Sequence, residues 1–181
     1  MSTRYGSATV VLPSDTTILI TRSFDAPAAL LVRALTEPEL VTRWRGLEEA
    51  QWEVCEIDLR VGGTWRYVVR QPCESEPDRE IAFHGEYREL DPPHRLVSTE
   101  VFEGVPEGKA VVSTTLDEVD GVTRRASWCN TVAKNTATAT SNRAWRSACR
   151  SATTASKTCF ATSDDKNWPE IVRPRHALQP R

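Results

Sequence analysis

This 181-residue sequence has only three histidines, no cluster of cysteines and no long apolar run. No apolar stretch approaches the roughly 20 residues that a membrane-spanning helix needs. The first residues also lack the basic stretch, apolar block and cleavage site of a secretory signal. We therefore expect a cytoplasmic protein without a membrane partner.

Motifs of metal, redox and phosphate chemistry are missing as well. The five cysteines form no C-x-x-C pair and have no histidine at metal-ligand spacing; they are Cys55, Cys73, Cys129, Cys149 and Cys159. An odd number of scattered cysteines predicts free thiols in a reducing compartment, with neither a zinc site nor a disulfide framework. Because a nucleophile elbow and a Gly-rich phosphate loop are absent too, we expect no metal and no cofactor.

Charge divides the chain into two unlike parts. Residues 1–124 carry 13 Lys and Arg against 22 Asp and Glu, whereas residues 125–181 carry 10 against 3. The acidic first part argues against nucleic-acid binding by a folded domain there. The basic second part is rich in Ala, Ser and Thr, which make up 24 of its 57 residues.

The first part alternates in the manner of β-strands and is punctuated by turns. We expect about six or seven antiparallel strands, over residues 16–24, 51–58, 64–70, 80–90, 95–102 and 110–118 and from 122 onward. Asp120-Gly121 predicts a hairpin turn, and Gly62-Gly63 a tight turn. Pro27 and Pro38 suit the starts of two short helices, over residues 28–36 and 39–44.

One face of the predicted sheet is aromatic. Strand periodicity puts Trp65, Tyr67 and Val69 on one side of their strand, and it groups Phe83 with Tyr87 on the next strand. The opposite faces are charged. A sheet of this kind needs a cover over its aromatic side.

Five strings in this part resemble one known family in their order and spacing. They are TRSFDAP at Thr21–Pro27, EPEL at Glu37–Leu40 before Trp44, DLRVGG at Asp58–Gly63, FHGEYRE at Phe83–Glu89 and DPPHRL at Asp91–Leu96. Together they resemble the Hsp90-ATPase-activator-like branch of the START-related (SRPBCC) superfamily. The resemblance covers roughly residues 16–124.

The resemblance implies an α+β fold of the helix-grip type, in which a curved antiparallel sheet grips a long C-terminal helix. Two short helices follow the first strand, and an apolar cavity lies between sheet and helix. We accordingly expect an N-terminal extension over 1–15, the helix-grip domain over 16–128 and an atypical tail over 129–181. The resemblance implies no catalytic residues for this chain, because the family has none that all members share.

Three functions stay open at this point. The first is binding of a small hydrophobic ligand without catalysis, which most relatives of this fold imply. The second is a co-chaperone-like interaction module with a chaperone or a second copy of the chain as its partner. The third is a cyclase-like enzyme, for which the sequence offers no buried pair of acid–base residues.

The candidate ligand cavity is aromatic; its predicted residues are Trp44, Trp65, Tyr67, Phe83, Tyr87 and Phe102. Simple core packing is the competing interpretation for each of them. His84 falls on the polar face of its strand, so we expect a surface histidine, and His94 falls in a turn. Asp58, Arg60 and the Gly62-Gly63 pair fit a turn and no catalytic role.

The tail departs from the family pattern. From Arg125 onward the chain has a single leucine, Leu178, and no apolar stripe with helical spacing, so the long C-terminal helix is missing or replaced. Codons for Trp145 and Cys149, read one base earlier, permit methionines four residues apart, each after a glycine, as in the family's helix. We hypothesise a reading-frame slip near residues 124–127, which would deprive this chain of the helix and its ligand function. A genuine disordered basic tail is the alternative.

Overall fold

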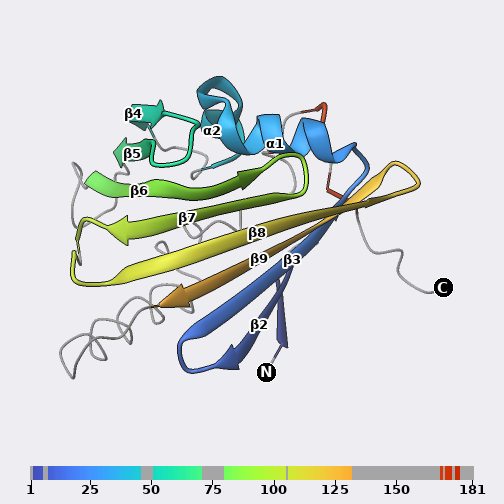
Figure 1. Cartoon of the computed structure of the whole chain (residues 1–181), viewed down its shortest axis with the longest axis horizontal. Coiled ribbons are helices and arrows are strands. Elements are labelled where there is room, and N and C mark those ends of the chain that lie inside the picture. Colours follow the sequence, from blue (N-terminus) through green and yellow to red (C-terminus); the bar gives the residue numbers. More distant parts are fainter. Residues whose placement is uncertain are drawn as a thin grey trace.

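The computed structural model describes residues 2–5, 8–45, 51–70, 80–104, 106–131, 168, 170–172 and 174–175. It contains one antiparallel sheet of nine strands in the order β1-β2-β3-β9-β8-β7-β6-β5-β4. The strands are β1 (Ser2–Tyr5), β2 (Ala8–Ser14), β3 (Thr17–Phe24), β4 (Gln51–Ile57), β5 (Thr64–Arg70), β6 (Glu80–Asp91), β7 (Arg95–Phe102), β8 (Lys109–Val119) and β9 (Val122–Thr131). The predicted α+β, helix-grip class with a curved sheet is confirmed (Figure 1).

Two short helices connect β3 to β4: α1 (Ala28–Thr36) and α2 (Pro38–Trp44). Helix α1 begins after Pro27, and Glu118 of β8 accepts a hydrogen bond from the Ala28 N–H at 2.8 Å. A carboxylate at this position satisfies a free amide and complements the positive end of the helix. Both helices lie on the same side of the sheet (Figure 1). None of the helices in the described part of the chain is long and apolar enough to cross a membrane.

The seven strands expected from the sequence correspond to β3–β9. Strands β1 and β2 lie within residues 1–15, the predicted N-terminal extension, and the sequence analysis predicts neither of them. Strand β2 pairs with β3, and its register shifts between Val11 and Ser14, next to Pro13. Proline cannot donate a ladder hydrogen bond, which accounts for an irregularity there.

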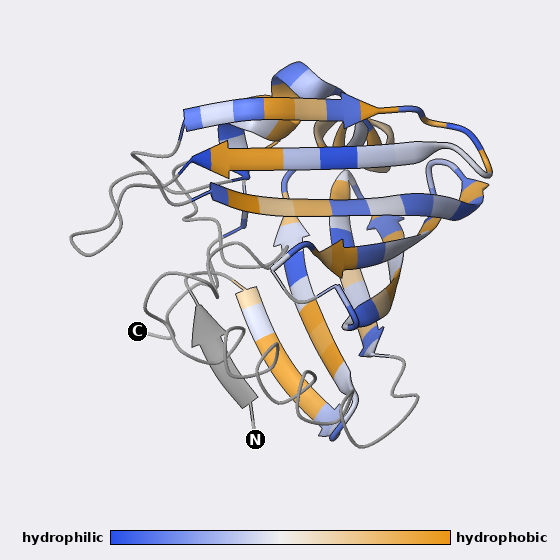
Figure 2. Ribbon diagram, turned by 90° about the vertical axis from the view of Figure 1, so that its left-hand side faces the viewer, coloured by the Kyte–Doolittle hydropathy of each residue, from blue (hydrophilic) through white to orange (hydrophobic). Residues whose placement is uncertain are grey.

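Alternation along the strands gives the sheet an inner and an outer face, visible as changing hydropathy along the ribbons (Figure 2). Ile18, Ile20, Arg22 and Phe24 are the buried positions of β3. The predicted turn at Asp120-Gly121 is confirmed, since both residues have the positive φ angles, 52° and 75°, of a tight hairpin.

The helices close the core at one end of the sheet. Trp44 is 2% exposed and donates a hydrogen bond from Nε1 to the Ala34 carbonyl at 2.7 Å. It stacks on Trp168, with ring centroids 4.4 Å apart and planes at 8°.

A short piece of the tail therefore belongs to this core. Val172 is fully buried in the same cluster, and the Arg175 N–H donates to the Ser23 carbonyl at 2.7 Å. Residues 132–167, which make up most of the predicted atypical tail, lie outside the described residues. The hypotheses about the tail's disorder and its reading frame stay predictions.

Candidate ligand cavity

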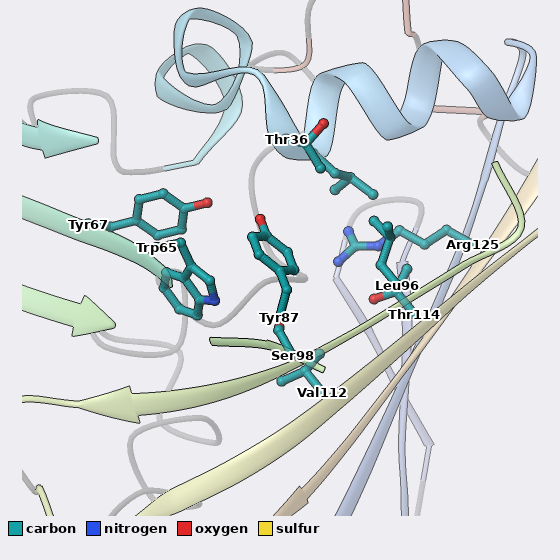
Figure 3. Close-up of a pocket in the computed structure, with 10 residues that line it drawn as sticks. Thr36, Trp65, Tyr67, Tyr87, Leu96, Ser98, Val112, Thr114 and Arg125 are labelled. Atoms are coloured by element: carbon teal, nitrogen blue, oxygen red, sulfur yellow. The ribbon is translucent and has the colours of Figure 1, made fainter. Parts of the chain in front are cut away.

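A small, partly open cavity lies between the inner face of the sheet and the C-terminal end of α1. Its volume is about 40 Å³. The side chains around it come from α1 and from five consecutive strands, β5 to β9 (Figure 3); they are Leu35, Thr36, Trp65, Tyr67, Tyr87, Leu96, Ser98, Val112, Thr114 and Arg125. Since one enclosed water needs roughly 10–15 Å³, the cavity has room for about three.

Three of the six predicted cavity residues line this space: Trp65, Tyr67 and Tyr87. Trp65 and Tyr67 are 3% and 4% exposed, and their ring centroids are 4.7 Å apart. The ring of Tyr87 stands up from the sheet toward Thr36 (Figure 3).

The other three lie elsewhere in the core. Trp44 stacks on Trp168 at the helical end of the sheet. Phe83 packs against Phe102, with ring centroids 5.2 Å apart, in the aromatic cluster beside the cavity. Their contact with a ligand stays a prediction.

The inner face also carries charge that the sequence interpretation did not anticipate. The buried charged side chains among the described residues are Arg22, Arg45, Arg125 and Glu100, each 5% exposed or less. Strand periodicity could have indicated that Glu100 faces inward, because it shares one face of β7 with Leu96 and Ser98, which line the cavity. The burial of these side chains was not predicted, because Arg and Glu are rarely buried in proteins.

Arg45 and Glu100 form an ion pair inside the aromatic cluster. Arg45 Nη2 is 3.7 Å from Glu100 Oε2, and the Arg45 guanidinium carbon lies 4.6 Å from the ring centroid of Tyr67. Trp65 and Phe83 flank the same guanidinium at 5.9 and 5.7 Å, so the cation lies among three aromatic rings. Burial raises the pKa of Glu100 to about 7, with Arg45 working in the opposite direction. The carboxyl therefore keeps its proton to a higher pH than an exposed glutamate does.

Arg125 carries the positive charge of the cavity wall. It lies directly opposite Arg22 in the register of β9 and β3, and its guanidinium points back toward the centre of the cavity (Figure 3). Burial, followed by the charges of Arg22 and Arg45, lowers the pKa of Arg125 to about 9. Arg125 thus remains a cation at neutral pH.

Hydroxyl groups make up the rest of the polar lining. Thr114 and Ser127 share a buried hydrogen bond of 2.9 Å, and Thr36 Oγ1 donates to the Val32 carbonyl at 2.7 Å. Burial raises the pKa of Tyr87 to about 12 and that of Tyr67 further, so both phenols stay protonated. The cavity therefore joins apolar surface to a cation and several hydroxyls.

The family can now be assigned. The model of the family described as "Activator of Hsp90 ATPase homolog 1-like protein" matches residues 25–151, more than half of the 181-residue chain. The chain belongs to this family. The resemblance predicted from the five sequence strings is confirmed. No match was found among curated proteins.

Solved structures share the fold of this Hsp90-ATPase-activator-like protein. A Rhodobacter sphaeroides protein is 25% identical with a TM-score of 0.68, and the match covers 83% of this chain and 92% of that one. A Mycobacterium smegmatis protein is 23% identical with a TM-score of 0.60, over 77% and 83% of the two chains. A Chromobacterium violaceum protein is 22% identical with a TM-score of 0.59, over 83% and 100%. These likenesses support the architecture and assign no ligand.

The polar candidates of this family member lie away from the cavity. His84 is exposed, and its Nδ1 lies 3.1 Å from Glu103 Oε1, which also accepts a hydrogen bond from Arg66 Nε at 3.0 Å. These contacts lower the pKa of Glu103, with the hydrogen bond from Arg66 as the largest cause. Their exposure makes them weak surface contacts. His94 lies in the turn between β6 and β7, as expected.

The Gly62-Gly63 turn serves the fold. Gly62 has a φ of 80°, and a side chain on Gly63 would collide with the backbone carbonyl of Asp58. Arg60 Nε donates to Asp58 Oδ2 at 2.7 Å across the same turn. Across the residues that the structure describes, no three His, Cys, Asp or Glu side chains gather as metal ligands would.

Proposed function

We propose that this domain binds a small hydrophobic ligand in the cavity between the sheet and α1. The observation that carries the proposal is the cavity's lining. Six of its ten residues are aliphatic or aromatic, and they come from α1 and four strands, β5 to β8; these six are Leu35, Trp65, Tyr67, Tyr87, Leu96 and Val112. Apolar walls with a few polar groups are typical of small-molecule sites.

The volume of the cavity limits the size of the ligand that it can enclose. At about 40 Å³ it accommodates a group of about three non-hydrogen atoms. A larger ligand must extend through the open side or displace side chains such as Tyr87. The proposal therefore favours compact ligands over long lipid chains.

A neutral fluorescent probe tests the proposal. N-phenyl-1-naphthylamine is larger than the enclosed space, so part of it must extend through the open side of the cavity; it should give a saturable rise in fluorescence with the full chain. Ser98→Phe places a ring in the cavity and should reduce probe affinity at least about tenfold, the effect of roughly 1.4 kcal/mol. Ser113→Phe is the matched control, because Ser113 lies on β8 outside the cavity lining. No saturable signal, or equal loss in both variants, would contradict the proposal.

Two other functions are less well supported. Glu100 supplies a buried carboxyl for a cyclase-like enzyme, yet it does not line the cavity and its partner is Arg45. The family description refers to an activator of the Hsp90 ATPase, which motivates the interaction module. Native mass spectrometry distinguishes the interaction module from the ligand-binding domain, since only the ligand-binding domain would co-purify with a small molecule.

We also propose a cytoplasmic location, from the sequence features described above.

A further inference from the structure

The aromatic cluster beside the cavity is continuous with the cavity lining. Trp65, Tyr67 and Tyr87 line the cavity and also belong to this cluster, together with Val41 and Phe83. The three shared rings form one end of the lining, and Arg125 lies at the other end (Figure 3). The cluster is therefore where the apolar wall of the cavity continues into the core, and apolar walls are what a hydrophobic ligand contacts.

A cationic side chain occupies the middle of this cluster. Arg45 is 4% exposed, and its guanidinium carbon lies 4.6 Å from the ring centroid of Tyr67, 5.7 Å from that of Phe83 and 5.9 Å from that of Trp65. Tyr67 and Trp65 also line the cavity, whereas Arg45 does not. The guanidinium thus fills space next to the cavity that an apolar group would fill at a lower cost in desolvation.

Arg45 reaches the cluster from the end of α2. It is the residue that follows the helix, and its N–H donates a hydrogen bond to the Val41 carbonyl at 2.9 Å. Arg45 belongs to no strand, so its side chain can leave the cluster without breaking a hydrogen bond of the sheet. A long arginine side chain can bring its charged end to water while its stem stays against apolar surface.

Glu100 holds the guanidinium among the rings. It is 2% exposed on β7, and its Oε2 lies 3.7 Å from Arg45 Nη2. This ion pair stabilises the buried cation only while the carboxyl is ionised, because a buried charge is costly once its partner is neutral. Uptake of a proton by Glu100 therefore shifts the balance toward an Arg45 side chain in water.

From this arrangement we propose that Arg45 is an internal plug of the ligand cavity, held in place by Glu100, and that its withdrawal extends the cavity into the aromatic cluster. The space between Trp65, Tyr67 and Phe83 then takes the apolar body of a ligand that the closed cavity of about 40 Å³ cannot enclose. Arg45 thereby determines the size of the ligand. The inference rests on the proposed function, because it concerns the same cavity.

Glu100 is the group of this cluster that titrates between pH 5 and pH 8. Burial raises its pKa to about 7. The other titratable or charged side chains around the pair, in the described part of the chain, are Cys55 of β4, Tyr67 of β5, Tyr87 of β6 and Arg125 of β9. Burial raises the pKa of Cys55 to about 11, that of Tyr87 to about 12 and that of Tyr67 further, and it lowers that of Arg125 to about 9. The protonated forms of these four groups therefore predominate throughout this range.

Removal of the plug tests the inference on the full chain. Arg45→Ala combined with Glu100→Gln removes both charges together, so that neither is left buried without the other. At pH 7 this double variant should bind N-phenyl-1-naphthylamine at least about tenfold more tightly than the unmodified chain, an effect of roughly 1.4 kcal/mol. Arg66→Ala combined with Glu103→Gln is the matched control, because it removes an exposed ion pair of 3.0 Å and should leave the affinity unchanged.

The pH dependence of probe binding tests the role of Glu100. The probe is neutral over this range, so a change in its affinity reports on the protein. The affinity of the unmodified chain should rise several-fold from pH 8 to pH 5, as Glu100 takes up its proton. Glu100→Gln should show the higher affinity at both pH values, because glutamine carries no charge to hold Arg45.

The outcomes separate the two proposals. Equal affinity of the unmodified chain and the double variant would overturn the plug and leave the hydrophobic site standing. Binding of the probe to none of the chains would overturn both proposals. A pH-independent affinity of the unmodified chain would overturn the role of Glu100. If the double variant does not fold, Glu100→Gln carries the test, since it preserves the size of the side chain, and an affinity at pH 8 equal to that of the unmodified chain would overturn the inference.

Discussion

The buried carboxyl of Glu100 should make the stability of this protein fall as pH rises toward neutrality. Its pKa is raised from 4.5 to about 7, and burial is the largest cause. Arg45 offsets the burial only partly. At 3.7 Å the pair is longer than a charge-assisted hydrogen bond of roughly 2.7–2.9 Å.

The direction follows from proton binding. Between pH 4.5 and about 7 the folded state keeps a proton on Glu100 that the unfolded chain releases. Stability is therefore highest below pH 4.5 with respect to this group and declines through that window. At about 1.4 kcal/mol per pH unit, the loss is roughly 3 kcal/mol.

Glu100→Gln isolates this effect, because glutamine resembles the protonated carboxyl and does not titrate. Urea denaturation at pH 5 and pH 8 should show the variant gaining roughly 3 kcal/mol relative to the wild type over that range. Glu107→Gln, at an exposed position, is the control and should follow the wild type. If Glu100→Gln instead loses about 3–5 kcal/mol at pH 8, the ion pair dominates and the reasoning is wrong.

Four further predictions concern the core and the tail. Trp65→Ala should lower the free energy of unfolding by about 3–5 kcal/mol, and a loss below about 1 kcal/mol in urea would place the ring outside the core. Gly85→Ala should destabilise through collision with the Thr99 carbonyl and the Trp65 ring, which thermal melting would detect as a lower Tm. Burial raises the pKa of the Cys55 thiol to about 11, so mass-spectrometric mapping at pH 8 should show slow alkylation there, and rapid reaction would contradict its burial. Genomic DNA across the codons for residues 120–130 should show the slipped frame, and an intact frame with hydrogen-exchange protection over 131–162 would refute it.

The sequence was sufficient for most of the sheet because alternation and turn residues act locally. Helix α1 has the predicted bounds of 28–36, and the Asp120-Gly121 turn forms as predicted. Strand β2 was not predicted, although Thr9, Val10 and Val11 are β-branched and lie close to β3. It forms a hairpin with β3 around Asp15-Thr16, which is neither of the Asn-Gly and Asp-Gly pairs typical of a two-residue hairpin turn.

The site was less predictable than the fold. Periodicity identified Trp65, Tyr67 and Tyr87 as inward residues, but it could not separate cavity lining from core packing. Trp44 shows the difficulty, since its partner Trp168 lies far along the chain in a segment without helical spacing. Glu100 and Arg125 follow the same alternation as their apolar neighbours, and their charge concealed that they are buried.

An amide NMR titration of the full chain with 2-naphthoate tests the central claim, a ligand cavity under α1, most directly. A ligand bound under α1 should cause saturable shifts concentrated on the backbone amides of lining residues, including Tyr87, Ser98 and Thr114. Amides of exposed residues remote from the cavity, such as Glu53 and Glu107, should stay unchanged. Shifts centred on the outer face, or no saturable shifts at all, would contradict it.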